Sequence, residues 1–175
     1  MEAVDVVLDN FEVSKEALLG EKGNGFNILL YWIAIEKIEQ SAAAVGIGQA
    51  ALDEAIKYSK TRVIRGKPIS QMQGIRWMLA EMEAKIQSAR WMTYRAAFLQ
   101  DNQDENWMAE AATTKIHVIP AMMEVVELSR RIHGAYGYTK DFKIERLYRA
   151  IAGASAIAVS LEINKSIVAG SLLNK

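Results

Sequence analysis

Two long stretches of this sequence carry apolar side chains at helical spacing, and no proline interrupts either stretch. The first runs from Phe26 to about Tyr58 and is mostly apolar. The second runs from about Gln71 to Gln100, and its apolar positions recur every three or four residues, which places them on one buried face. At ~1.5 Å per residue the second helix is about 45 Å long, a length typical of large bundles.

Three further helices complete the predicted fold. One is expected at about Asn106–Ile132, where Pro120 should kink the helix rather than end it. Shorter helices are expected around 144–149 and 154–172. Short links between long helices favour antiparallel neighbours. The predicted fold class is all-α, an antiparallel four-helix bundle that forms one domain over residues 20–175.

Three residues have expected roles around the first helix. Asn24 ends the glycine-rich turn GEKGNG and is expected to cap the helix N-terminus. Gly46 and Gly48 lie inside the helical pattern. Because glycine has no side chain, both are expected to let a neighbouring helix approach closely.

The N-terminal residues follow a different pattern. Val4 to Val13 alternates loosely between apolar and polar residues, which predicts one β-strand. A single strand cannot satisfy its backbone hydrogen bonds alone. Residues 1–19 are therefore expected to be a strand remnant of a preceding β-domain, together with a linker.

Composition argues against several classes of protein. Lys and Arg total 21 and Asp and Glu total 21, which argues against a nucleic-acid binder or a polybasic membrane protein. No apolar run approaches the ~18 residues of a transmembrane helix. The chain has no cysteine, and its two histidines, His117 and His133, are isolated, so no metal site is expected. A cytoplasmic location is the default expectation.

Five motifs follow one another along the chain in a specific order. They are GEKGNGF, AVGIGQAALDEAIKY, RxxRGKPIxxxQ, LAEMEAKI and RIHGAYGYTKDFKIERLYR. Together they resemble the C-terminal helical domain of the acyl-CoA dehydrogenases, flavoenzymes that oxidise acyl-CoA thioesters with FAD. The resemblance extends from about Val7 to Ala169.

The resemblance implies several partners. In the family, a helical N-terminal domain and a middle β-domain precede this region, and they supply much of the flavin and acyl pocket. The chain by itself is therefore expected to be inactive. The implied partners are those two domains, an acyl-CoA substrate, and electron-transfer flavoprotein or a similar acceptor. The family also forms dimers or tetramers through these helices, so a homo-oligomer is expected.

The resemblance offers two positions for the catalytic base. Most members carry a glutamate in a YEGTS stretch near the C-terminus, and that register places Ala158 at the base position. Alanine accepts no proton. The isovaleryl and long-chain members carry the base on the first helix of this domain, and that register selects Glu36. Glu36 is the predicted base, and the alternative is that it lies on a solvated helix face with Lys37 or with Gln40.

Two further stretches carry the expected FAD contacts. Arg62 and Gln73 match the arginine and glutamine with which the family grips the FAD of a neighbouring subunit, but Arg65 stands at the phenylalanine position. An ordinary basic loop is the alternative. In the family motif QxxGGxGY, this chain keeps Gly134 but has Arg131 and Ala135 in place of glutamine and glycine.

The remaining expected contacts follow Ala158. Ser160 matches a threonine that bonds FAD in the family, although it could equally cap a helix or face solvent, and Glu162 matches a polar contact. Two further positions depart from the family: Lys37 replaces an arginine and Ala150 replaces an aspartate.

Two functions are consistent with these residues. The first is the C-terminal domain of an FAD-dependent oxidoreductase that dehydrogenates an acyl-CoA thioester between its α and β carbons. The alternative is a non-catalytic subunit or oligomerisation module of a hetero-oligomeric acyl-CoA dehydrogenase. The departures at Arg65, Arg131, Ala135, Ala150 and Ala158 favour the alternative.

Overall fold

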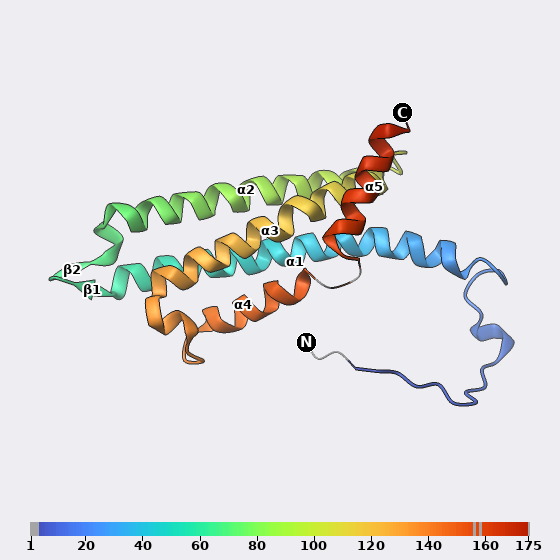
Figure 1. Cartoon of the computed structure of the whole chain (residues 1–175), viewed down its shortest axis with the longest axis horizontal. Helices are drawn as coiled ribbons and strands as arrows, with labels where there is room; N and C mark the ends of the chain where they lie inside the picture. Colours follow the sequence, from blue (N-terminus) through green and yellow to red (C-terminus); the bar gives the residue numbers. More distant parts are fainter. Residues whose placement is uncertain (1–3, 156, 158, 175) are drawn as a thin grey trace.

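The computed structural model describes residues 4–155, 157 and 159–174. Over these residues five α-helices form: α1 (Gly25–Thr61), α2 (Gln73–Asp101), α3 (Trp107–His133), α4 (Lys143–Ala154) and α5 (Leu161–Leu173). α1, α2 and α3 lie side by side, α4 runs along the same bundle, and α5 crosses it near one end (Figure 1). α3 contacts all four of the other helices, so it is the centre of the bundle. The predicted all-α bundle is confirmed.

The two last helices differ in extent from their predicted ranges. α4 continues to Ala154 because Ile144, Leu147 and Ile151 form one buried stripe along it. α5 begins only at Leu161, because the Ser160 side chain accepts a hydrogen bond from the backbone N–H of Ile163 and caps the helix. The link between α4 and α5 is therefore longer than the sequence indicated.

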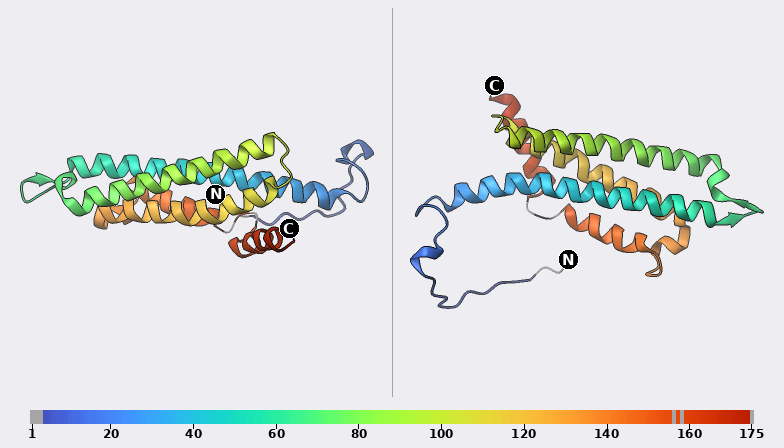
Figure 2. Two further views of the ribbon diagram at one scale, coloured as in Figure 1. Left: turned by 90° about the horizontal axis from the view of Figure 1, so that it is seen from above. Right: turned by 180° about the vertical axis from the view of Figure 1, so that it is seen from behind.

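A short hairpin joins α1 to α2 at one end of the bundle. β1 (Val63–Ile64) pairs antiparallel with β2 (Lys67–Pro68). The turn residues Arg65 and Gly66 have φ of 50° and 77°. Two successive left-handed residues match the twist of a two-residue hairpin, which explains the glycine. Figure 2 shows this hairpin at the end of the bundle opposite to α5.

The N-terminal segment does not form the predicted strand. Residues 4–14 are exposed and without regular structure, and only the short 3-10 helix Lys15–Ala17 follows. A strand needs a neighbour to receive its backbone hydrogen bonds. In the described chain the only paired strands are β1 and β2, so nothing stabilises a strand here.

The core lies where α1, α2 and α3 meet. A Cβ on Gly48 would collide with the sulfur of Met122 and lie 3.5 Å from Ile86 Cγ1, so this glycine does permit close packing. Gly46, by contrast, is exposed and has no atom within 4 Å of the same position. Ser129 of α3 donates a hydrogen bond to the carbonyl of Ala51 in α1 at 2.8 Å.

Three further sequence expectations concern these helices. α3 continues through Pro120, as predicted. Asn24 occupies the N-cap position of α1, but its side chain accepts from the Asn27 amide at 2.8 Å instead of capping the backbone. Among the described residues, no helix is long and apolar enough to cross a membrane.

Candidate functional site

The predicted site residues fall into two groups at opposite ends of the bundle. One group is Glu36, Ser160 and Glu162, and the other is Arg62, Gln73 and Gly134. Glu36 and Arg62 both belong to the long helix α1 or its end. At ~1.5 Å per residue they lie about 39 Å apart along the helix. Within one chain, the structure therefore does not bring the predicted residues into one site.

Glu36 is partly buried on α1 and makes one side-chain hydrogen bond. Its Oε1 accepts from Nε2 of Gln40 at 2.9 Å, one helical turn away. Its Oε2 is buried and has no hydrogen-bond partner among the described residues. Leaving a buried oxygen without a donor is unfavourable by about 1–3 kcal/mol, so this acceptor requires an explanation, and a catalytic role is one of them. Glu36 is thus not on a fully solvated helix face.

Lys115 of α3 is a charged residue whose pKa is affected by Glu36, and it is fully buried at 0% exposure. Its Nζ donates to the carbonyls of Ile157 and Val159 at 2.8 and 3.0 Å. Burial lowers the pKa of Lys115, the Glu36 carboxylate raises it in opposition, and the charge of Lys37 lowers it further. Glu36, Lys37 and Lys115 thus form one cluster of interacting charges, in which the two lysines are buried and Glu36 is partly buried.

Lys37 completes this cluster from α1. Its side chain is only 4% exposed, and burial lowers its pKa. A buried lysine is uncommon unless it is paired, because removing an ammonium group from water is unfavourable. The sequence showed Lys37 only as a departure from the family pattern and did not indicate that it is buried.

The region of the usual family base lies beside the same cluster. Ala158 itself is outside the described residues, but Ile157 and Val159 on either side of it are held by Lys115. Sequence reasoning missed Lys115. The available signal was a lysine among the small and apolar residues of α3, since its neighbours at helical spacing, Ala111 and Ala112, are buried.

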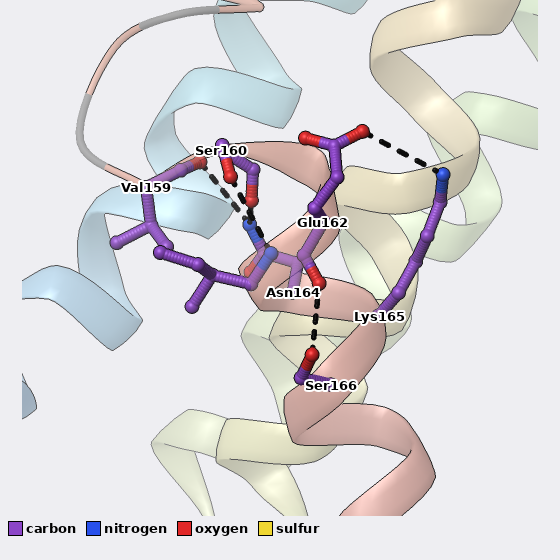
Figure 3. A network of polar contacts seen from close by, with 7 residues as sticks. Val159, Ser160, Glu162, Asn164, Lys165 and Ser166 are labelled. Carbon is purple, nitrogen blue, oxygen red and sulfur yellow. Dashed lines mark hydrogen bonds and ion pairs between the residues drawn. The ribbon is translucent and has the colours of Figure 1, made fainter.

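The start of α5 carries several polar groups that bond to one another (Figure 3). Ser160 Oγ accepts from the Ile163 N–H at 3.4 Å, which leaves the hydroxyl proton available as a donor. Asn164 Nδ2 donates to the carbonyls of Val159 and Ser160 at 3.2 and 2.9 Å. Its Oδ1 is buried without a partner among the described residues. Glu162 is exposed and lies 3.9 Å from Lys165 Nζ.

A groove of about 350 Å³ lies at the hairpin end of the bundle. It is lined by Arg62, Arg131 and Gly134, with Tyr58 and His133 among its ring-bearing residues. Two guanidinium groups beside apolar and aromatic surface suit an anionic ligand that carries a planar ring, since arginine binds phosphate in a bidentate manner. The departure at Arg131 therefore adds a cation to the groove that Arg62 lines.

The glycine loop that follows α3 has two distinct roles. Gly134 has φ of 63°, and no atom lies within 4 Å of the position a Cβ would occupy. It therefore supplies a left-handed turn and leaves open space beside the groove. A Cβ on Gly137 would lie 2.6 Å from the carbonyl oxygen of Arg130, so Gly137 is required for packing against α3.

Two residues near this end lie outside the groove. Gln73 is exposed and lines a neighbouring depression with Arg76 and Trp77, so the structure does not bring it to Arg62. Arg65 is exposed at the hairpin tip. The resemblance implies a phenylalanine at this position, and the charged side chain of Arg65 offers no aromatic face.

The two histidines differ in their surroundings. His133 is buried, its Nδ1 lies 2.8 Å from the carbonyl oxygen of Ser129, and its ring stacks on Tyr58 with centroids 4.4 Å apart. His117 is exposed. Among residues 4–155, 157 and 159–174, no group of three or more acidic or histidine side chains is arranged to hold a metal ion.

Comparison with known proteins identifies similar sequences. A family model described as "Acyl-CoA dehydrogenase, C-terminal domain" matches residues 23–173. The chain is 37% identical over 169 residues to a 3-(aryl)acrylate reductase of Clostridium sporogenes, covering 97% of this chain and 45% of that protein. It is 34% identical over 171 residues to caffeyl-CoA reductase-Etf complex subunit CarC of Acetobacterium woodii, covering 98% of this chain and 45% of that protein.

Solved structures of acyl-CoA dehydrogenases contain the same fold as this chain. Butyryl-CoA dehydrogenase from Megasphaera elsdenii matches with a TM-score of 0.87 and 33% identity, over 92% of this chain and 42% of that chain. A glutaryl-coenzyme A dehydrogenase in complex with glutaryl-CoA matches with a TM-score of 0.89 and 34% identity, over 95% and 42%. The chain spans less than half the length of these relatives.

Proposed function

This chain belongs to the acyl-CoA dehydrogenase family, as its C-terminal domain, and we propose that it forms part of an FAD-dependent enzyme that dehydrogenates an acyl-CoA thioester. The observation that carries this proposal is the buried, unpartnered Oε2 of Glu36 beside Lys115 and the α4–α5 link. A carboxylate oxygen that accepts no hydrogen bond from the protein is available to accept a proton from a substrate.

Glu36 has the role of base in this proposal. Its Oε2 removes the α-proton of the thioester, and the electron pair of that C–H bond becomes part of the new double bond. When bound, the flavin supplies the acceptor for the hydride that leaves the β-carbon. The hydrogen bond from Gln40 to Oε1 orients the carboxylate and leaves Oε2 for the proton. Alanine at position 158 supplies no second proton acceptor.

The residues of both ends fit parts of FAD. Arg62, Arg131 and the open space at Gly134 suit the pyrophosphate and adenosine portion. At the other end, the Ser160 hydroxyl and the unpartnered Asn164 Oδ1 suit polar ring edges, with Glu162 nearby. The match of Gln73 to the family also makes it a candidate contact, from the depression beside the groove.

The distance between the two ends favours an oligomer. Glu36 and Arg62 are about 39 Å apart on a helix that rises ~1.5 Å per residue, which exceeds the reach of one dinucleotide. One flavin would therefore use the Glu36 end of one chain and the Arg62 groove of a second copy. We propose a homo-oligomer, a dimer or a tetramer, in which two copies share each flavin.

The remaining partners follow from the family. We propose that residues 1–19 link this domain to a middle β-domain, which with an N-terminal helical domain completes the acyl pocket. Electron-transfer flavoprotein or a similar protein would accept the electrons, in line with the name of the Acetobacterium relative, a subunit of a caffeyl-CoA reductase-Etf complex. The proposed location is the cytoplasm.

A non-catalytic subunit is the second candidate function. The observation that favours it is the exposed Arg65 at the hairpin tip, where the family carries a phenylalanine, together with Ala158 at the usual base position. Such a chain would serve assembly in a hetero-oligomer and would acquire flavin only with its partner.

Flavin content separates the two candidates. The full-length protein should be purified alone, its absorbance near the flavin bands measured, and acyl-CoA thioesters of different chain lengths added without oxygen. Stoichiometric FAD that is bleached by a thioester is the result expected of the enzyme. A colourless protein that gains flavin only with a second subunit would overturn the enzyme proposal and support the subunit role.

A further inference from the structure

Two backbone carbonyls of the described residues between α4 and α5 bond to the bundle. Lys115 Nζ donates to Ile157 O at 2.8 Å and to Val159 O at 3.0 Å, across more than forty residues of sequence. The lysine belongs to α3, the central helix, and is fully buried. The contact thus joins Ile157 and Val159 to the central helix of the bundle.

Asn164 holds the same segment from the other side. Its Nδ2 donates to Val159 O and Ser160 O at 3.2 and 2.9 Å. Val159 O therefore accepts from both Lys115 and Asn164. The α5 N-terminus, which carries Ser160, is fixed through the same carbonyl that Lys115 binds.

The charges around Lys115 connect this contact to Glu36. The charged groups that act on Lys115 from α1 are the Glu36 carboxylate and the Lys37 ammonium, and the link contributes the two carbonyls. An ammonium group has three donors, and two of them are used by the link. Among the described residues, the Glu36 carboxylate is the anion that acts on this buried cation.

We propose that Lys115 is a positioning residue that clamps the α4–α5 link to α3 at the two carbonyls flanking position 158, and thereby fixes Ser160 relative to Glu36. The clamp stands on the hydrogen bonds alone. Its catalytic consequence, the alignment of Glu36 with the flavin-binding residues, rests on the proposed function.

The clamp can be tested in the 175-residue chain by NMR. Lys115→Met removes all donors but keeps the length of the side chain. We expect it to shift the carbonyl ¹³C resonances of Ile157 and Val159 and to raise amide exchange at 159–164 about tenfold, while α1 stays protected. Lys115→Arg, which keeps the donors, should restore at least part of the protection.

Lys85→Met is the matched control. Lys85 also joins two helices, through an ion pair with Glu124 at 2.6 Å, but it lies away from the link. It should leave the carbonyl shifts and the exchange of 159–164 unchanged. If Lys115→Met leaves them unchanged too, or if Lys85→Met alters them equally, the clamp is refuted.

The wild-type chain provides the answer if Lys115→Met fails to fold. A buried, hydrogen-bonded ammonium group exchanges its protons slowly enough to give a ¹⁵N-detected signal, whereas a solvated one does not. A protected Lys115 signal that correlates with the Ile157 and Val159 carbonyls supports the clamp, and its absence overturns it.

The catalytic consequence is measured separately in the full-length protein. If the clamp aligns Glu36, Lys115→Met should slow flavin reduction by the thioester with little change in FAD content, and Lys115→Arg should partly restore the rate. An unchanged rate in an active enzyme refutes the catalytic consequence and leaves the clamp to the NMR result. A wild-type protein without activity refutes the proposed function instead.

Discussion

Two glycines that are two residues apart in α1 should respond oppositely to the same substitution. Gly48 faces the core, where an added Cβ would collide with the Met122 sulfur and touch Ile86 at 3.5 Å. Gly46 is exposed and has nothing within 4 Å. We therefore expect Gly48→Ala to destabilise the fold and Gly46→Ala to stabilise it.

The magnitude follows from two opposing contributions. Alanine is favoured over glycine inside a helix by about 1 kcal/mol, and both variants gain this. Forcing a methyl group into a filled core is unfavourable by about 1–3 kcal/mol, and only Gly48→Ala incurs this. Met122 and Ile86 are both fully buried, so neither can move aside without disturbing other side chains. The two variants should differ by about 1–3 kcal/mol.

The assay is urea or thermal unfolding of the 175-residue chain, followed by circular dichroism. For a domain of this size, ~1 kcal/mol shifts the melting temperature by about 2–4 °C. Gly46→Ala should melt above the wild type, and Gly48→Ala should melt below Gly46→Ala by several degrees. Equal shifts in the two variants would refute the packing assigned to Gly48.

Two further predictions concern ionisable groups. The pKa of Lys115 should fall in Glu36→Gln, because the carboxylate raises it, and should rise in Lys37→Met, because the Lys37 ammonium lowers it. The pKa can be followed through the side-chain NMR signals of Lys115. Shifts of the same sign in both variants would contradict the proposed interaction of these three charges. The hydrogen bond from Arg130 lowers the pKa of Glu127. A pKa that is lower in the folded than in the unfolded state stabilises the fold fully above the unfolded pKa, and this stabilisation is lost as pH falls. Glu127→Gln should therefore reduce the decrease in the free energy of unfolding below about pH 4.3, the ordinary glutamate pKa. The same dependence of the free energy of unfolding on pH in the variant and the wild type would contradict this.

The long helices could be predicted because their apolar spacing repeats over many residues. The repeat does not show which of two nearby glycines faces a neighbour, and so Gly48 was predicted correctly and Gly46 wrongly. The start of α5 depended on one cap, Ser160, in a stretch of small residues that is also compatible with helix. The N-terminal strand was wrong because strand formation depends on a neighbour that the local pattern does not reveal.

The candidate site was predictable only in part. Glu36 was selected from its register in the family, but its unpartnered oxygen is a property of the folded chain. Lys115 was missed because a lysine on a helix usually faces solvent, and its partners are backbone carbonyls distant in sequence. Arg62 and Arg131 meet in one groove only because α1 and α3 end side by side.

The base assignment is the central claim, and flavin reduction in the full-length protein tests it most directly. Glu36→Gln should retain stoichiometric FAD but slow anaerobic bleaching by an acyl-CoA thioester by about 10²–10⁴-fold, the usual contribution of a general base. Glu39→Gln, an exposed glutamate on the same helix, is the matched control and should react like the wild type. Bleaching of Glu36→Gln at the wild-type rate would contradict the assignment of Glu36 as the base.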